Sequence, residues 1–276
     1  MNSNFLKNSD SKNSLQKRQI LQLCINEGNF SLADLSKELN LSIPTTTRLT
    51  EELIENGFIE DMGKQDTSGG RRPSIYGLKS SAGYFVGTDI GKANVSICIT
   101  DFKGSTIAFQ PGIPFRVENT EASFREVCGL IKKEIKKAGI KQEKVLAYGV
   151  NLSGRVNNET GYCFTYFIGE DRPIASLLEE ELCAPVYVEN DSRAMTYGES
   201  NMLFLNVSWG LGMGMVIDGK LSYGKSGFSG EIGHFPMMSN GQICHCGKTG
   251  CLETAASGSA AHRIVLEKRL MRLLRG

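Results

Sequence analysis

The sequence lacks any long apolar run: no stretch approaches the roughly 18 apolar residues that a membrane-spanning helix needs. Its polar N-terminus contains no apolar core, so we expect no secretory leader. Charge of one sign is also missing, because 31 Lys and Arg stand against 30 Asp and Glu. A net charge of +1 excludes a uniformly basic nucleic-acid coat and an acidic solvating tail. These absences predict a cytoplasmic protein with no membrane partner.

What the sequence does contain is typical of a folded protein. Of its 276 residues 40% are hydrophobic and 22% are charged, and at about 150 residues per domain this length predicts about two domains. Eight cysteines are present, three of them clustered late in the chain. The other five stand among apolar residues and are expected to be reduced core cysteines: Cys24, Cys98, Cys128, Cys163 and Cys183.

The first part of the chain has the pattern of three helices. Residues 14–27 carry apolar side chains at helical spacing. Ser31 and Asp34 then form a capping box that opens a short helix over 32–39. A third helix is predicted to begin near Ser42, with a proline in its first turn, where no backbone N–H is needed.

Two strands, 58–62 and 71–78, follow around a glycine-bearing loop, and this order predicts a winged helix-turn-helix over residues 1–80. Such a domain binds operator DNA, usually as a dimer on paired half-sites, with its second motif helix in the major groove. A polar helix face and a solvated arginine pair are the alternatives. The candidate DNA contacts are Thr45, Thr46, Thr47, Arg48, Arg71 and Arg72.

The pattern of residues 81–200 predicts an α/β lobe. Three strands, at 84–90, 93–100 and 105–110, precede helices and strands that alternate from residue 119 onward. This order predicts an actin-like fold of the ribonuclease-H-like, sugar-kinase type. Residues 201–276 then supply only a partial second lobe, so we expect that lobe to be incomplete.

Three short motifs in these lobes have two interpretations each. Asp89 with Gly91 suits either a metal–phosphate contact or a hairpin turn. Asp191, at the end of a strand, is either a general base or a helix N-cap. Residues 209–214 alternate with glycine, which suits either a phosphate cradle or an ordinary β-turn.

The clustered cysteines give the most specific signal. With a histidine ten residues upstream they have the spacing H-x9-C-x-C-x4-C. Three thiolates and one imidazole complete a closed tetrahedral shell, which is the shell of a structural zinc ion. His245 is a rival ligand that we expect to point outward. The predicted ligands are His234, Cys244, Cys246 and Cys251.

The block from Gly230 to His234, followed by the cysteines and Glu253, closely resembles the signature of the ROK family. That family comprises repressors, the products of uncharacterised open reading frames, and sugar kinases. The N-terminal winged helix resembles that of the family's transcriptional repressors. This resemblance implies a sugar-responsive repressor that binds a small sugar or sugar phosphate and forms a homodimer or higher homo-oligomer. It assigns the sugar site to Asn190, Asp191, Glu231, His234 and Glu253.

In the family's kinases the counterpart of Asp191 is the catalytic base, so an ATP-dependent hexose kinase is the alternative function. Lys92 and Ala93 depart from the kinase pattern, as do Ser208 and Trp209, and the adenosine-binding half has no counterpart before residue 276. These departures argue against ATP as a cofactor and against an enzyme. A truncated chain that retains only DNA binding is a third possibility.

Overall fold

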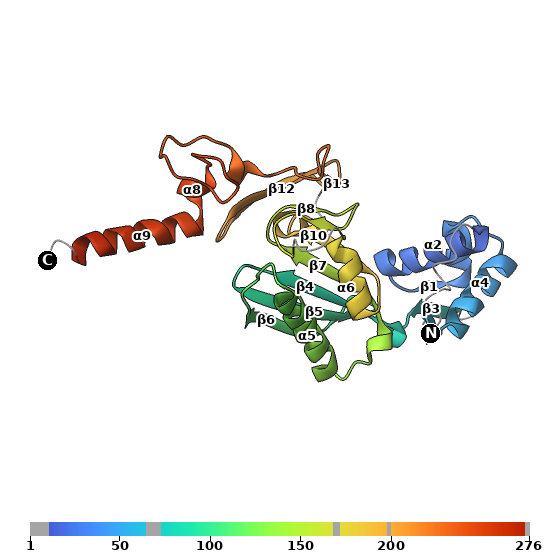
Figure 1. Ribbon diagram of the computed structural model, residues 1–276. Helices are drawn as coiled ribbons and strands as arrows, with labels where there is room; N and C mark the ends of the chain where they lie inside the picture. Colours follow the sequence, from blue (N-terminus) through green and yellow to red (C-terminus); the bar gives the residue numbers. More distant parts are fainter. Residues whose placement is uncertain (1–10, 65–72, 168–171, 198–199, 274–276) are drawn as a thin grey trace. The chain divides into compact units, whose positions relative to one another are not determined.

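The computed structural model describes residues 11–64, 73–167, 172–197 and 200–273 (Figure 1). Its N-terminal part contains three helices and a three-stranded antiparallel sheet of order β1-β3-β2. The arrangement is the predicted winged helix. Its elements are α2 (Lys12–Glu27), β1 (Phe30–Ser31), α3 (Leu32–Glu38), α4 (Ile43–Glu55), β2 (Ile59–Lys64) and β3 (Ser74–Leu78).

The helix ends follow from the capping residues. The Ser31 hydroxyl accepts a hydrogen bond from the Asp34 amide at 3.2 Å, and the Asp34 carboxylate accepts one from the Ser31 amide at 3.2 Å. This confirms the capping box, which satisfies amides that a helix leaves free at its start. Ser42 caps α4 in the same way, with its hydroxyl accepting from the Thr45 amide.

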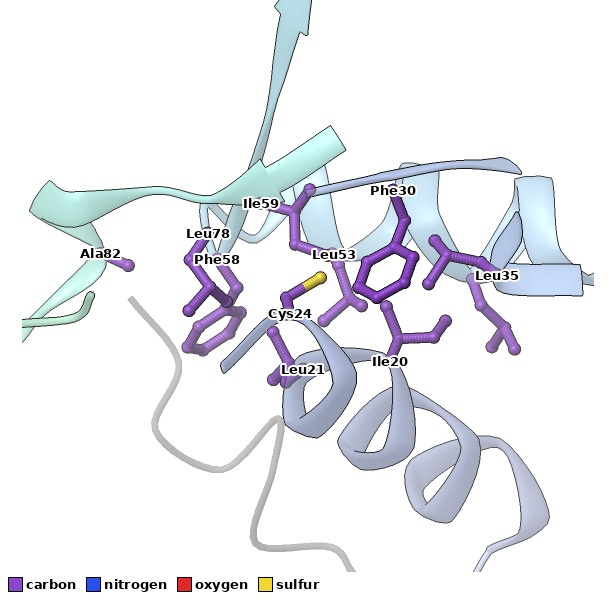
Figure 2. Packing of buried hydrophobic residues seen from close by; sticks show 11 residues of the cluster. Ile20, Leu21, Cys24, Phe30, Leu35, Leu53, Phe58, Ile59, Leu78 and Ala82 are labelled. Carbon is purple, nitrogen blue, oxygen red and sulfur yellow. The ribbon is translucent and has the colours of Figure 1, made fainter. Parts of the chain in front are cut away.

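One hydrophobic core holds the winged helix together. In Figure 2 the side chains of Ile20 and Cys24, from α2, point toward Leu53 of α4 and Phe30 of β1. Phe102, from the turn after β5 (Asn94–Asp101), packs against the same core, with its ring 5.7 Å from that of Phe58. The core is therefore built from all three helices and the sheet.

The next elements form a five-stranded sheet of order β10-β7-β4-β5-β6. The helices α5 and α6 come between its later strands in the chain, as predicted, and a two-stranded ribbon, β8 with β9, follows β7. The bounds are β4 (Tyr84–Ile90), β5 (Asn94–Asp101), β6 (Thr106–Pro114), α5 (Glu121–Lys137), β7 (Val145–Leu152), β8 (Val156–Asn157), β9 (Tyr162–Cys163), α6 (Ile174–Leu182) and β10 (Val186–Asn190).

The last part contains a second antiparallel sheet, of order β11-β12-β13, followed by a loop region and two helices. In its register Leu203 lies opposite Met215, and Val207 opposite Leu211. The elements are α7 (Asp191–Ala194), β11 (Met202–Val207), β12 (Leu211–Ile217), β13 (Lys220–Leu221), η3 (Ile232–His234), α8 (Glu253–Ala256) and α9 (Gly258–Leu273).

Two sequence-based expectations are corrected here. The glycine-rich stretch 209–214 is not one turn, because β12 already begins at Leu211. A Cβ on Gly212 would lie 2.4 Å from Ser192 Oγ, so this glycine allows close packing of a strand on α7. Cys183 is exposed at the end of α6, so it is not a core cysteine.

The chain forms two compact units. One consists of residues 1–86, 97–110 and 132–148, and the other of 87–96, 111–131 and 149–276. In the described parts of the chain, no helix combines the length and apolar character needed to cross a bilayer.

Candidate functional site

The predicted metal ligands come together in the loop region between β13 and α8. His234 lies on η3, and the cysteines follow on a loop held by isolated bridges such as Pro236 with Cys251. The ligand atoms of all four residues lie within 4.8 Å of one another. Cys244 Sγ is 3.5 Å from His234 Nδ1, and Cys246 Sγ is 3.6 Å from Cys251 Sγ.

These separations fit a tetrahedral zinc ion. Zinc–sulfur bonds of about 2.3 Å and zinc–nitrogen bonds of about 2.0 Å place ligand atoms roughly 3.5–3.8 Å apart. Gly250 permits the tight loop, since its φ is +75° and a Cβ there would lie 2.1 Å from the Met238 carbonyl oxygen. The residues present therefore fit the group that their spacing predicts.

The pKa shifts of the cysteine and histidine side chains are also consistent with metal binding. Burial raises the pKa of the Cys244 thiol to about 12 and also raises the pKa of Cys251. Burial lowers the pKa of His234, which favours the neutral imidazole that metals bind. Because buried thiols ionise only with a compensating charge, a bound cation would favour their thiolate forms.

His245 does not simply point outward. Its side chain is 64% exposed, but its Nδ1 lies 3.0 Å from Glu253 Oε1. The other oxygen of Glu253 accepts a hydrogen bond from the Leu211 amide at 3.1 Å. Burial would raise the pKa of Glu253, but these two donors outweigh it and lower that pKa. Both oxygens of Glu253 therefore already have partners in the protein.

The end of β10 presents a second polar cluster. The Ser153 hydroxyl donates to Asp191 Oδ2 at 2.8 Å, and the Ser192 amide donates to Asp191 Oδ1 at 2.7 Å. Asn190, not Asp191, caps α7, because its Oδ1 accepts from the Arg193 amide. Asp191 is therefore held by neutral donors and is free of the capping role.

Carboxylates gather around Asp191. Burial raises the pKa of Asp89, and the nearby charge of Asp191 raises it further. Burial also raises the pKa of Glu231, with Asp191 and Glu253 adding to the shift. Four acidic side chains from the predicted motifs are thus close enough for their charges to interact: Asp89, Asp191, Glu231 and Glu253. Vicinal hydroxyl groups are suitable partners for such carboxylates.

His234 joins the two clusters. Its Nδ1 faces the Cys244 sulfur, while its Nε2 lies 3.6 Å from Glu231 Oε2. An ion on Nδ1 would fix the tautomer and orient the other ring nitrogen toward Glu231. The structure thus brings Asp191, Glu231, His234 and Glu253 into one region, as the resemblance implied.

The turn between β11 and β12 carries an aromatic side chain. Trp209 stands there with its ring centroid 5.7 Å from Lys92 Nζ and 5.5 Å from the His262 ring. The Gly258 amide donates to the Ser208 carbonyl at 2.7 Å, so the start of α9 closes on the same turn. The side chains of Trp209 and His262 and the start of α9 therefore border the turn where the glycine pattern suggested a phosphate cradle.

On α4 the predicted DNA contacts differ in exposure. Thr46 is wholly buried and donates to the Ser42 carbonyl, so its inclusion among the DNA contacts is wrong. Thr45 and Thr47 are partly exposed. Arg48 is exposed and pairs with Glu52 on the same helix. The predicted contacts Arg71 and Arg72 lie outside the described residues.

Sequence reasoning missed two residues of the β10 region. The Ser153 hydroxyl donates to Asp191. Its position as a polar residue directly after a buried strand could have identified it from the sequence. Arg193 is 1% exposed and bonds to three separate segments. A lone arginine in a short polar helix gave no sign of that burial.

Comparison with known proteins identifies the domains. The sequence pattern of the ROK family matches residues 85–271, and that of the MarR family matches residues 14–64. The chain belongs to the ROK family. The first match covers the five-stranded sheet, the β11-β12-β13 sheet and the histidine–cysteine cluster, and the second covers the helices of the winged helix.

The curated relatives include bacterial repressors. The chain is 30% identical to the xylose repressor of Caldicellulosiruptor bescii over 266 residues, which cover 91% of this chain and 66% of that protein. It is 25% identical to the DNA-binding transcriptional dual regulator NagC of Escherichia coli, over 97% of this chain and 67% of that protein. The chain thus spans about two thirds of the length of these relatives.

Solved structures agree on the fold. A ROK family transcriptional regulator, a homologue of the E. coli MLC protein, superposes with a TM-score of 0.69 at 24% identity, covering 92% of this chain and 68% of that one. The ROK hexokinase of Thermus thermophilus gives 0.53 at 29% identity, covering 68% of this chain and 64% of that one. The winged helix and the actin-like ROK fold are both confirmed.

Proposed function

We propose that this ROK family chain is a sugar-responsive transcriptional repressor. The observation that carries the proposal is the presence, on one chain, of a winged helix and a cluster of carboxylates suited to sugar hydroxyls. The named relatives include repressors, which supports the same function. The DNA-binding domain corresponds to residues 1–80, the first lobe to 81–200, and the metal-bearing part to 201–276.

The ligand of the carboxylate cluster is a sugar or a sugar phosphate. Asp191 and Glu231 accept hydrogen bonds from its hydroxyls, with Asn190 and Glu253 at the border of the site. A sugar that lacks the matching hydroxyls leaves these buried acceptors unpaired and is rejected. His234 orients Glu231 from the other side.

The metal is a structural zinc ion on His234, Cys244, Cys246 and Cys251. Four protein ligands fill a tetrahedral shell and leave no open position. The ion therefore has a structural role and not a catalytic one. It holds the loop that follows β13 and keeps the ring of His234 oriented.

DNA is bound by the exposed part of α4, through Thr45, Thr47 and Arg48, together with the wing arginines Arg71 and Arg72. These contacts serve phosphates and base edges. The near-neutral charge of the whole chain keeps the affinity of one copy for DNA modest. A homodimer on paired half-sites adds the affinity that one copy lacks.

A gel-shift titration tests this function. The zinc-loaded chain is mixed with DNA from upstream of its own gene at low salt, and D-xylose, N-acetyl-D-glucosamine and their phosphates are added in turn. We expect retardation, and its loss with one of these ligands. The paired variants Arg71→Ala and Arg72→Ala should weaken DNA binding without changing sugar binding. Absence of retardation with any upstream fragment contradicts the proposal.

A sugar kinase is the second candidate, supported by the Asp191 carboxylate at the end of β10, which accepts a hydrogen bond from the Ser153 hydroxyl. Trp209 opposes it, because this bulky side chain lies on the turn near the expected phosphates. A coupled ADP-release assay over a hexose panel separates the two functions. We expect no release above that of Asp191→Asn; release that this variant abolishes would favour the kinase.

A further inference from the structure

The largest wholly buried side chain that the structure describes is an arginine next to the carboxylate cluster. Arg193 is 1% exposed and lies on α7, two residues after Asp191. Charged side chains are almost never this buried unless they are paired. The burial of this charged side chain therefore needs an explanation from its partners.

The guanidinium group of Arg193 joins three segments that are far apart in the sequence. Its Nε donates to Glu189 Oε1 at 2.7 Å, on β10. One terminal nitrogen donates to the Gly227 carbonyl at 2.7 Å, and the other donates to the Val156 carbonyl, on β8, at 2.6 Å. A planar fork with five N–H donors can serve three such directions at once, which a lysine ammonium on a flexible stem cannot.

Each of these segments leads into the candidate sugar site. Glu189 precedes Asn190 and Asp191, while Val156 follows Ser153 and Gly154. The Ser153 hydroxyl and the Gly154 carbonyl in turn bond to Asp191 and Asn190. Arg193 therefore sits behind the residues that face the ligand.

The third segment, residues 222–230, is followed directly by Glu231. Its far end is fixed on β12, where the Met213 amide donates to the Gly230 carbonyl at 3.0 Å. Its middle is held by Arg193, through the Gly227 carbonyl and through the Tyr223 ring, whose centroid lies 5.6 Å from the guanidinium carbon. Burial raises the pKa of Tyr223 and the nearby Glu189 carboxylate raises it further, so Tyr223 lies close to both members of the buried Arg193–Glu189 pair.

We propose that Arg193 is a positioning residue of the sugar site, which clamps segment 222–230 onto β8 and β10 and thereby sets where Glu231 stands relative to Asp191. This inference rests on the proposed function for its ligand. Arg193 itself contacts no sugar. Its effect passes through Glu231, so sugar affinity depends on the shape of its hydrogen-bonding fork and not on its charge alone.

The test compares Arg193→Lys, which keeps the charge and removes the fork, with Arg125→Lys, at an exposed pair with Glu121 on α5. Binding of D-xylose and N-acetyl-D-glucosamine is measured by calorimetry on the full, zinc-loaded chain. We expect Arg193→Lys to lose about tenfold or more in affinity for the sugar that binds, the size typical of supporting contacts. Arg125→Lys should bind as the unchanged chain does.

A double-mutant cycle separates positioning from general support. In a Glu231→Gln background Arg193→Lys should cost less than about threefold, because residues acting through one another are not additive. Equal losses in both backgrounds overturn the proposal, as does a folded Arg193→Lys protein whose sugar affinity is unchanged.

Hydrogen exchange provides a readout that needs no sugar. In Arg193→Lys the amides of residues 222–231 should exchange about tenfold faster, with α2 to α4 unchanged. Unchanged exchange in this segment overturns the inference. If no sugar binds the unchanged chain, the ligand part of the proposed function fails, and this exchange measurement still decides the role of Arg193.

Discussion

At the scale of single residues, Glu52 joins two helices of the winged helix. Its carboxylate pairs with Lys17 on α2 and with Arg48 on α4. The hydrogen bond from Lys17 is the main reason that the pKa of Glu52 is lowered. A lowered pKa in the folded state means that the pair stabilises the fold above the ordinary value of 4.5, and that this stabilisation is lost as pH falls through the lowered value.

We therefore predict that Glu52→Gln lowers the free energy of unfolding by about 1 kcal/mol at neutral pH. The loss is small because solvent screens the partly exposed ion pairs of Glu52. The difference from the unchanged chain should shrink as pH falls below 4.5 and vanish below the lowered pKa, where Glu52 is protonated in both states. Urea unfolding at neutral and at acidic pH measures it. Glu51→Gln, at an exposed neighbour, is the control, and an equal difference at both pH values would contradict the assignment.

Cys251 offers a second prediction at this scale. It is wholly buried within the cluster, whereas Cys183 is exposed on α6. We expect the purified chain to hold about one zinc ion, as a closed four-ligand site does. Cys251→Ser should remove most of that zinc and lower the melting temperature, and Cys183→Ser should change neither. Mass spectrometry of the metal content measures this, and full zinc occupancy in Cys251→Ser would argue against the site.

Spacing along the sequence was enough to predict that the four candidate metal ligands come together, because they lie within 18 residues of one another. It was not enough for Thr46, whose burial depends on which side of α4 meets the core. Arg193 was missed for a related reason. Its partners Val156 and Gly227 are more than 30 residues away, and nothing local marks such contacts.

At the scale of elements, α3 illustrates how much a cap contributes. This helix has seven residues and too few internal hydrogen bonds to be stable alone. Ser31→Ala should lower the free energy of unfolding by about 1 kcal/mol, because it removes the acceptor for the Asp34 amide. Ser31→Thr keeps a hydroxyl and should retain most of the stability. Thermal unfolding measures both, and equal losses would show that the hydroxyl has no capping role.

The elements themselves were largely predictable. Helix α6 falls on the predicted residues 174–182, and β4 on 84–90, since apolar periodicity and flanking breakers define both. The start of β12 was missed because glycine is a turn signal in sequence. In the fold Gly212 and Gly214 are strand residues whose missing side chains make room for α7.

At the scale of the whole molecule, the proposed function requires that sugar and DNA influence each other. A sugar shifts an equilibrium between two states only by binding one of them more tightly. If the sugar weakens DNA binding by some factor, then DNA must weaken sugar binding by the same factor, typically about 5–150-fold. This equality holds whatever path connects the winged helix to the carboxylate cluster.

We predict that saturating the chain with its operator DNA raises the dissociation constant for the sugar by the factor that the sugar imposes on DNA binding. Calorimetric sugar titrations with and without DNA give one factor, and fluorescence anisotropy of labelled DNA with and without sugar gives the other. Asp191→Asn, which weakens sugar binding, should leave sugar-free DNA affinity unchanged. If sugar binds equally well with and without DNA, the chain binds both ligands but does not act as a sugar-responsive repressor.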